Sequence, residues 1–337
     1  MHIGAGGRIA FYGVFDLLKR YGKRLLPVVL LLLPLFAVLL HAQADEREFI
    51  RYAEFNVPYA ALERALEDDI ACEGAVSWVD VLACLAAKYG GEWKRYKSAD
   101  MDALLERLHN GEPVEAVAEG LPYFGYFRQV YGAVLGGFVG WHLQEGRDDR
   151  WSVRYGLTAY SPLAEGYWYN HFDDFGASRS YGFRRRHLGH DMMGSVGTPV
   201  VAVEGGTVEA LGWNQYGGWR VGIRSADGKR YYYYAHLRKG HPYAANLAEG
   251  QKVRAGDVIG YLGQTGYSHN EDVNGIETPH LHWGLELVFD ESQKESDNEI
   301  WVDLYAITRL LERHRATVHA EGKEYVREYE MLLFTPR

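Results

Sequence analysis

Two segments about ninety positions apart hold the side chains of this chain that are best suited to chemistry. The first, His187-Leu-Gly-His-Asp191, places an imidazole and a carboxylate four residues apart with a glycine between them. The second, Pro-His280-Leu-His282-Trp, lies in an apolar run that is typical of a β-strand. Because residues i and i+2 of a strand project from the same face, both late imidazoles can face one cleft. Nitrogen and oxygen donors of these types are ligands that zinc takes in proteins.

A third histidine, His236, ends the strand-like run Tyr231-Tyr-Tyr-Tyr-Ala between those two segments. Catalytic zinc sites use three protein ligands and leave one position open for water. His187, Asp191 and one of the later histidines would form such a set. The residue types and their spacing leave open which later histidine completes it.

Four sequence blocks occur in one order along this part of the chain. They are His-x-Gly-x-Asp from residue 187, Tyr-Ala-His-Leu from residue 234, Lys-Val-x-Ala-Gly-Asp-Val-Ile-Gly-Tyr-Leu-Gly-x-Thr-Gly from residue 252, and Pro-His-Leu-His from residue 279. In this order, over roughly residues 157–290, the blocks resemble the lysostaphin/LytM-type zinc endopeptidases of bacterial cell walls. A single His-x-His is common, whereas four ordered blocks are specific.

The resemblance implies a complete site. One Zn²⁺ per chain would be held by His187, Asp191 and His282, while His236 and His280 would flank the bound water and the scissile carbonyl. It also implies a β-sandwich-like, duplicated hybrid motif fold and a substrate in the peptide part of peptidoglycan. The chain contains no His-Glu-x-x-His sequence, which excludes the thermolysin-type arrangement.

Several nearby residues have other expected roles. His190 lies beside Asp191, but the one-residue offset should point it away from the metal. Tyr181 precedes the first ligand by six residues and could donate to the oxyanion. Of the four consecutive tyrosines, one alternate pair should be core and the other could line a substrate groove. The segment Ser268–Glu277 lengthens the usual connection to the last block, and we expect it at the rim of the cleft, where it would affect substrate preference.

The amino-terminal segment predicts export. Residues 25–40 form an uncharged apolar run, preceded by Lys19, Arg20, Lys23 and Arg24, which places the amino terminus in the cytoplasm. Ala42-Gln-Ala44 matches a signal-peptide cleavage pattern, so residues 1–44 are either a cleaved signal or a single-pass membrane anchor, and we favour the anchor. Both readings place the rest of the chain at the extracytoplasmic face of a bacterial membrane or in the cell wall.

Residues 45–145 predict a helical accessory domain. Expected helices are Tyr59–Cys72, a helix that begins at the Ser77/Asp80 capping-box pattern and ends near residue 90, Met101–Leu108, and Tyr123–Val139. Glu67 and Glu92 are of the type that a lysozyme-like domain would use, but solvated helix faces explain them more simply. Cys72 and Cys84 either form one disulfide or are two buried thiols.

The pattern changes after residues 141–156, which we interpret as a linker. Residues 152–318 then predict antiparallel strands and, over 301–315, a helix that packs on the sheet; residues 319–337 are expected to form a carboxyl-terminal tail. The resemblance implies that residues 152–318 are the peptidase domain. The expected strands are Thr198–Val203, Thr207–Trp213, Trp219–Arg224, Arg230–His236, Val258–Leu262 and His282–Phe289, with a hairpin turn at Asp227-Gly228. The whole chain is therefore predicted to be α+β: a membrane segment, a helical domain and an all-β antiparallel peptidase domain.

Charge excludes one class of partner. The formal net charge is −9, although residues 1–44 hold five basic residues and one acidic residue, so the exported part is acidic. Nucleic acid is not expected as a partner, because phosphate neutralisation needs Lys and Arg. The favoured function is an exported zinc endopeptidase acting on peptidoglycan. The rivals are a catalytically silent relative that binds peptidoglycan or regulates another hydrolase, and a carrier domain of similar sheet topology.

Overall fold

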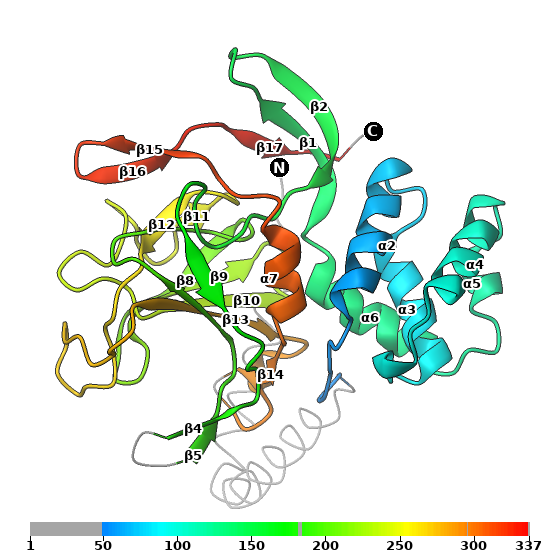
Figure 1. Ribbon diagram of the computed structural model, residues 1–337, viewed down its shortest axis with the longest axis horizontal. Helices are drawn as coiled ribbons and strands as arrows, with labels where there is room; N and C mark the ends of the chain where they lie inside the picture. Colours follow the sequence, from blue (N-terminus) through cyan, green and yellow to red (C-terminus); the bar gives the residue numbers. More distant parts are fainter. Residues whose placement is uncertain (1–48, 181–183, 295, 336–337) are drawn as a thin grey trace, which may run out of the picture. The chain divides into compact units, whose positions relative to one another are not determined.

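The structure is a computed structural model that describes residues 49–180, 184–294 and 296–335. The predicted membrane segment, residues 25–40, and Tyr181 lie outside the described residues. Every helix within the described ranges is too short or too polar to cross a membrane. Residues 51–337 pack as one compact unit in which helices precede an antiparallel β structure (Figure 1).

The four helices expected in the first part of this unit are confirmed. The helical segments are α2 (Tyr59–Ala71), α3 (Trp78–Tyr89), the 3-10 turn η1 (Trp93–Arg95), α4 (Ser98–His109), the short α5 (Val114–Val117) and α6 (Phe124–Leu135). Helix α3 is buried along most of its length, and it packs against α2, α4 and α6. Its apolar sequence therefore makes it the centre of the helical layer.

The cap at the start of α3 differs from the capping box that the sequence pattern predicts. Ser77 makes no side-chain hydrogen bond to the helix, so the expected capping box is wrong. Asp69 supplies the cap instead: its Oδ2 accepts a hydrogen bond from the Trp78 backbone amide at 2.7 Å, and its Oδ1 accepts one from the Tyr155 hydroxyl at 2.7 Å. A buried carboxylate from a neighbouring element therefore satisfies the helix end. Cys72 and Cys84 are free thiols.

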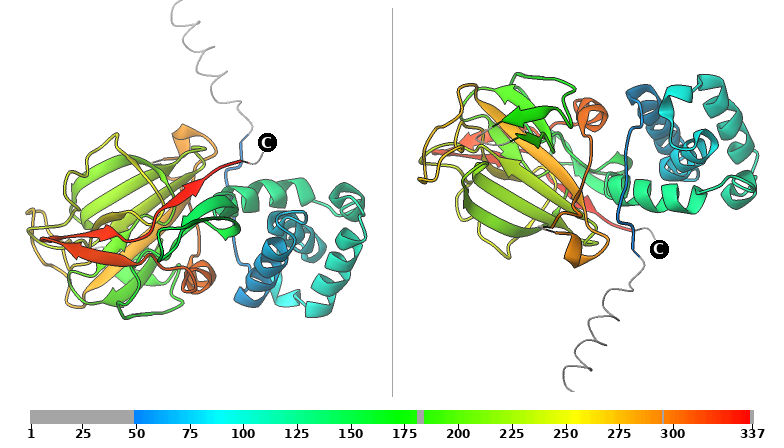
Figure 2. Two further views of the ribbon diagram at one scale, coloured as in Figure 1. Left: turned by 90° about the horizontal axis from the view of Figure 1, so that it is seen from above. Right: turned by 90° about the horizontal axis from the view of Figure 1, so that it is seen from below.

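The segment interpreted as a linker is a β-hairpin, so that interpretation is wrong. Strands β1 (Val139–Glu145) and β2 (Trp151–Leu157) pair antiparallel, and β17 (Met331–Leu333) completes a three-stranded sheet on the other edge of β1. Figure 2 shows the red carboxyl-terminal strands beside this green hairpin. The residues expected to form a tail thus carry β17 as well as a second hairpin, β15 (Val318–Glu321) with β16 (Glu324–Arg327).

An eight-stranded sheet forms the centre of the β part. Its order is β11-β8-β9-β10-β13-β6-β3, with β14 paired to β13, and the described pairings are antiparallel. The strands are β3 (Tyr169–His171), β6 (His190–Gly194), β8 (Gly206–Asn214), β9 (Gly218–Ser225), β10 (Arg230–Ala235), β11 (Lys252–Val253), β13 (His280–Leu287) and β14 (Ile300–Trp301). The hairpin predicted at Asp227-Gly228 is confirmed, because β9 and β10 are neighbours on either side of it.

Smaller pairs of strands complete the β part. Strand β7 (Pro199–Val201) pairs with β12 (Val258–Tyr261), and β4 (Ser178–Ser180) pairs with β5 (Arg184–Arg186). The six predicted strands are thus all present, as β7, β8, β9, β10, β12 and β13, while the other strands were not predicted. Helix α7 (Tyr305–Leu311) is present but shorter than expected. Its Arg309 contacts α2, since the guanidinium lies 4.1 Å from the centre of the Tyr59 ring.

A buried ion pair connects the sheet to the helices. Arg230, which is 2% exposed, donates to both carboxylate oxygens of Glu204 at 2.7 and 3.1 Å and to the carbonyl of Ala133 in α6 at 2.8 Å. Tyr232 also donates to Glu204, at 2.6 Å. The guanidinium therefore satisfies a buried carboxylate and a carbonyl near the end of a helix.

Arg230→Ala should destabilise the protein by about 3–5 kcal/mol, because it leaves the Glu204 carboxylate buried without its cation. Urea unfolding of the purified protein measures this loss. Arg254→Ala is the matched control, since the Arg254–Glu330 pair is exposed and such pairs contribute about 1 kcal/mol or less. The double variant Arg230→Met/Glu204→Gln should recover part of the loss. Equal free energies of unfolding for Arg230→Ala and Arg254→Ala would contradict this account.

Candidate metal centre

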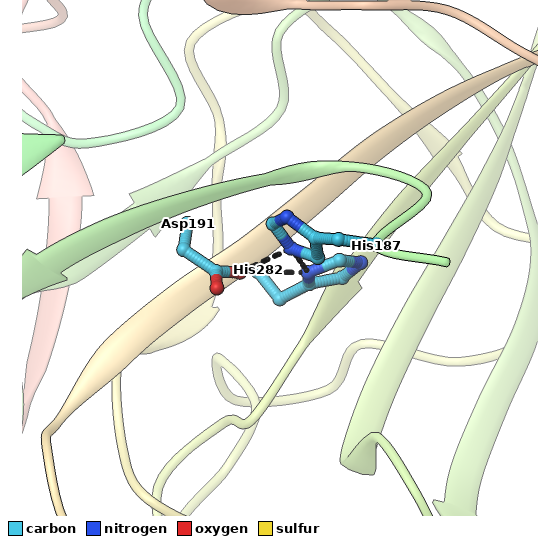
Figure 3. Close-up of side chains that lie close together, drawn as sticks. All are labelled: His187, Asp191 and His282. Atoms are coloured by element: carbon cyan, nitrogen blue, oxygen red, sulfur yellow. Dashed lines mark hydrogen bonds and ion pairs between the residues drawn. The ribbon is translucent and has the colours of Figure 1, made fainter. Parts of the chain in front are cut away.

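The side chains of His187, Asp191 and His282 converge on one point (Figure 3), and all three line one cleft. Asp191 Oδ1 lies 3.0 Å from His187 Nε2 and 2.8 Å from His282 Nδ1, and the two nitrogens are 3.1 Å apart. One oxygen and two nitrogens thus form a compact triangle of potential ligand atoms. The structure brings together the three residues that the resemblance implied as ligands.

Strand pairing explains two of these positions. Asp191 of β6 lies directly opposite His282 of β13, so their side chains project from the same face of the sheet. His187 reaches the same point from the loop that precedes β6. The glycine between them is required, because a Cβ on Gly189 would lie 2.5 Å from the His282 ring. The spacing of the first block therefore follows from a close approach of this loop to β13.

The triangle fits a tetrahedral ion. Ligands about 2.0–2.1 Å from zinc are separated by roughly 3.3 Å in tetrahedral geometry, close to the observed separations. Burial alone would raise the pKa of Asp191, but hydrogen bonds from His187 and His282 outweigh it and hold that pKa far below its usual range. Burial lowers the pKa of His282. Burial also acts to lower the pKa of His187, but the hydrogen bond and charge of Asp191 outweigh it and raise that pKa. An ionised carboxylate beside a neutral imidazole is the protonation state that metal binding needs.

Two residues that the sequence did not single out hold the candidate ligands in place. His187 Nδ1 lies 3.1 Å from Asp174 Oδ1, and Asp191 Oδ2 accepts a hydrogen bond from Arg179 at 3.0 Å. Arg179 also pairs with Asp174. A histidine ligand is commonly oriented by a carboxylate on its other nitrogen. Neither residue has a fixed spacing from the ligands in the sequence, so only the folded structure reveals them.

His236 and His280 lie beside the triangle, with their ring centroids 4.8 Å apart. His236 Nδ1 is 2.9 Å from the Thr265 carbonyl, and His280 Nδ1 is 2.8 Å from the Thr278 carbonyl. A carbonyl can only accept, so each Nδ1 carries the proton and, in the neutral ring, each Nε2 keeps a lone pair. His280 Nε2 is 3.8 Å from Asp191 Oδ1, farther than the 2.8 Å of the His282 nitrogen.

His236 is also held in a strained backbone conformation. Its φ of 61° is left-handed, which is unfavourable for a residue other than glycine. Its backbone amide donates to the Gly217 carbonyl at 2.7 Å, so neighbouring structure holds this conformation. Such strain is concentrated at functional sites. Burial, and then the nearby His280 and His282, lower the pKa of His236 well below its usual value.

All five of these residues line one cleft of about 1080 Å³. Tyr231 and Tyr233 line it as well, whereas Tyr232 and Tyr234 are buried in the core, which confirms the expected alternation. Within the extended connection, Asp272 accepts hydrogen bonds from Trp219 Nε1 at 2.9 Å and from the Gly240 amide at 2.7 Å. These contacts fix the connection to the strand and loop beside the cleft.

His190 lies outside the cleft, as expected from its offset. Its Nε2 is 2.7 Å from His171 Nδ1, and its ring is 5.9 Å from that of Tyr305 in α7. Burial lowers the pKa of His190 to about 3. A neutral imidazole that packs against β3 and α7 has a structural role.

Comparisons with known proteins agree with this geometry. Residues 185–296 match the sequence model of Peptidase family M23. This range includes the triangle of His187, Asp191 and His282 as well as His236 and His280. The chain is 37% identical over 147 residues to the L-Ala–D-Glu endopeptidase of Bacillus subtilis (strain 168), covering 43% of this chain and 41% of that protein. It is 38% identical over 98 residues to lysostaphin of Staphylococcus simulans, covering 29% and 17%.

The chain therefore contains a peptidase domain of family M23, homologous to the endopeptidases named above. A crystal structure of a lytM protein from Ruminococcus gnavus aligns with a TM-score of 0.54 at 24% identity, over 79% of this chain and 91% of that one. This likeness shows a shared fold that reaches beyond the residues of the family match. The chain spans less than half the length of the curated relatives it matches.

Proposed function

We propose that this protein is an exported zinc-dependent endopeptidase that hydrolyses peptide bonds in peptidoglycan. The observation that carries this proposal is the triangle of His187, Asp191 and His282 in a cleft that also presents His236 and His280. His187, Asp191 and His282 would hold one Zn²⁺. Zinc in such a site polarises a scissile carbonyl and makes water nucleophilic near neutral pH, with a pKa of about 7.

The two other histidines would handle protons. With Nδ1 fixed by a backbone carbonyl, the Nε2 atom of each ring can accept a proton from the attacking water. One ring takes that proton, and the other, once protonated, stabilises the oxyanion and gives a proton to the leaving amine. The lowered pKa of His236 keeps that ring neutral, which suits it to act as the base.

Substrate and location are inferred from relatives and from the sequence. Relatives named as L-Ala–D-Glu endopeptidase, glycyl-glycine endopeptidase and peptidoglycan DD-endopeptidase support a peptide bond of the cell wall as the target. Residues 25–40 would hold the protein at the membrane or direct its secretion, and the helical residues 45–145 would position the peptidase domain, residues 152–318. Peptidoglycan is thus the proposed partner.

Digestion of purified sacculi tests this function. The full-length protein should contain one zinc per chain and release peptide fragments whose new amino and carboxyl ends mass spectrometry can identify. Removal of zinc by a chelator should stop the release, and adding zinc back should restore it. A zinc-loaded protein that binds sacculi without cutting any peptide would instead be a silent relative that binds peptidoglycan.

The helical residues should contribute no glycan cleavage. The side chains of Glu67 and Glu92 are 55% and 65% exposed and pair with Arg313 and Arg95. A carboxylic acid that protonates a glycosidic oxygen usually lies in an apolar pocket. We expect the full-length protein to release no reducing sugar ends, and Glu67→Gln and Glu92→Gln to match its peptide release. Reducing ends that disappear in either variant would show that the protein is bifunctional.

A further inference from the structure

A buried carboxylate, Glu286, lines the same cleft, and one of its oxygens has no hydrogen-bond partner among the described residues. Glu286 is 2% exposed, and its Oε1 atom receives no hydrogen bond from any described residue. A buried polar atom in this state destabilises the folded protein, and more so when it is charged. Native structures retain few such groups without a functional reason.

The sheet places Glu286 on the face that carries the metal centre. His280, His282, Gly284 and Glu286 alternate along β13, so their positions project to the same side. Glu286 and His282 line the same cleft. Four residues of strand separate them, which corresponds to roughly 13 Å at about 3.3 Å per residue. Glu286 therefore lies several peptide units from the proposed cleavage point.

Aromatic rings lie beside β13 between His282 and Glu286. A Cβ on Gly284 would lie 2.6 Å from the Trp301 ring, so the glycine lets this ring cover the strand between His282 and Glu286. The Trp301 ring centroid is 6.2 Å from that of Tyr233, which is in turn 6.0 Å from that of His282. The cleft therefore extends from the candidate metal centre past Tyr233 and Trp301 to Glu286.

Among the described residues, the cations that act on Glu286 are paired with other carboxylates. Lys294 pairs with Glu209 and lies 4.3 Å from the Tyr231 ring centre, while Arg224 is shared between Glu209 and Glu291. Burial, and then the neighbouring Glu299, raise the pKa of Glu286 to about 7, whereas Lys294 and Arg224 oppose this increase. A cation bound from solution would lower that pKa and remove the cost of the unpaired carboxylate.

We propose that Glu286 recognises an ammonium group of the peptide substrate, and so determines which peptides fit the cleft. A carboxylate and an ammonium form a short, charge-assisted hydrogen bond, which a neutral amide cannot replace at equal strength. The ammonium belongs either to a side chain or to a free amino terminus of the substrate. This proposal rests on the proposed function, since it assigns a subsite of the same cleft.

Chemical acetylation of the substrate tests the subsite. Acetic anhydride converts the free amines of purified sacculi to neutral amides. For the full-length protein, the cleavage rate at low substrate should fall about 10–100-fold on acetylated sacculi, the range expected for loss of a charged hydrogen bond. Glu286→Gln should lose a similar factor on untreated sacculi and little more on acetylated ones. With partly acetylated sacculi, the acetyl positions in uncut fragments identify a side-chain or terminal amine.

Two further measurements separate a subsite from a structural role. Asp297→Asn is the matched control, because this exposed acid also lines the cleft and should leave sensitivity to acetylation unchanged. Glu286→Gln should keep its zinc and have an unchanged or higher Tm, because it removes an unpaired buried carboxylate. A lower Tm, or equal sensitivity to acetylation in Glu286→Gln and the parent, would overturn the proposal.

Failure of the proposed function can be distinguished from failure of the subsite proposal. If the zinc-loaded parent cuts no sacculi, co-sedimentation with untreated and acetylated sacculi replaces the cleavage assay. Binding that acetylation weakens in the parent but not in Glu286→Gln would support the subsite in a protein that only binds. Binding of the parent that acetylation does not change would overturn the subsite as well.

Discussion

Replacing Asp191 with alanine should leave the protein without zinc and reduce peptide release from sacculi to background. Asp191 Oδ1 lies within 3.0 Å of both His187 Nε2 and His282 Nδ1, so its loss removes the central atom of the triangle. It also removes the only anionic member of that triangle, and with it the charge that balances the metal. His187→Ala should have the same result, because two donors remain where a zinc site needs three.

A graded series makes this prediction sharper. Asp174→Asn keeps all three candidate ligands but weakens the partner of His187 Nδ1, so zinc affinity should fall about 10–100-fold without complete loss. His190→Gln is the matched control, because this imidazole is one residue from Asp191 yet contacts His171 outside the cleft. Zinc content is measured by mass spectrometry and zinc affinity by chelator competition, and together they rank the variants by how well they bind zinc. Stoichiometric zinc in both Asp191→Ala and His187→Ala would refute the assignment of the ligands.

Removal of His236 or His280 should separate metal binding from catalysis. Neither residue belongs to the triangle, so His236→Ala and His280→Ala should keep about one zinc per chain. Peptide release should nevertheless fall by roughly 10²–10⁴-fold, the usual contribution of a positioned acid–base group. The two variants should resemble each other, since each removes one of two Nε2 atoms that a backbone carbonyl has fixed for proton transfer.

The pH dependence provides a second measurement of the same pair. Burial and the nearby histidines lower the pKa of His236, so the neutral ring persists to lower pH than for an exposed histidine, whose pKa is about 6.5. Bound zinc adds positive charge that acts in the same direction. Protonation of His236 should therefore reduce the cleavage rate of the parent only below about pH 6.5, at lower pH than the loss of the nucleophilic zinc-bound water below about pH 7. Zinc lost in His280→Ala but retained in His282→Ala would show that the two late histidines are assigned in reverse.

The sequence by itself predicted which side chains lie together in the candidate site, because its signals are local. Alternation along a strand predicts that His280 and His282 share a face, and the first block contains the glycine that a close approach to β13 requires. The same alternation separated Tyr231 and Tyr233, which line the cleft, from Tyr232 and Tyr234, which lie in the core. Helical periodicity located α2, α3, α4 and α6 for the same reason, since each apolar face is contained within one short segment.

Only the tertiary structure decided features that depend on residues far apart in the chain. Residues 141–156 resemble a linker in the sequence, but they form part of a sheet. In that sheet β1 pairs with β2 and with β17, which lies nearly two hundred positions later. Asp69 replaces Ser77 as the cap of α3 because packing, which local sequence does not encode, brings its carboxylate to the helix end. Asp174 and Arg179 support the metal centre through contacts without a fixed sequence spacing. Alternation places Glu286 on the same face as His282, but its burial follows from the pairing of β13 with β10 and β14, which places Tyr231 and Trp301 beside it.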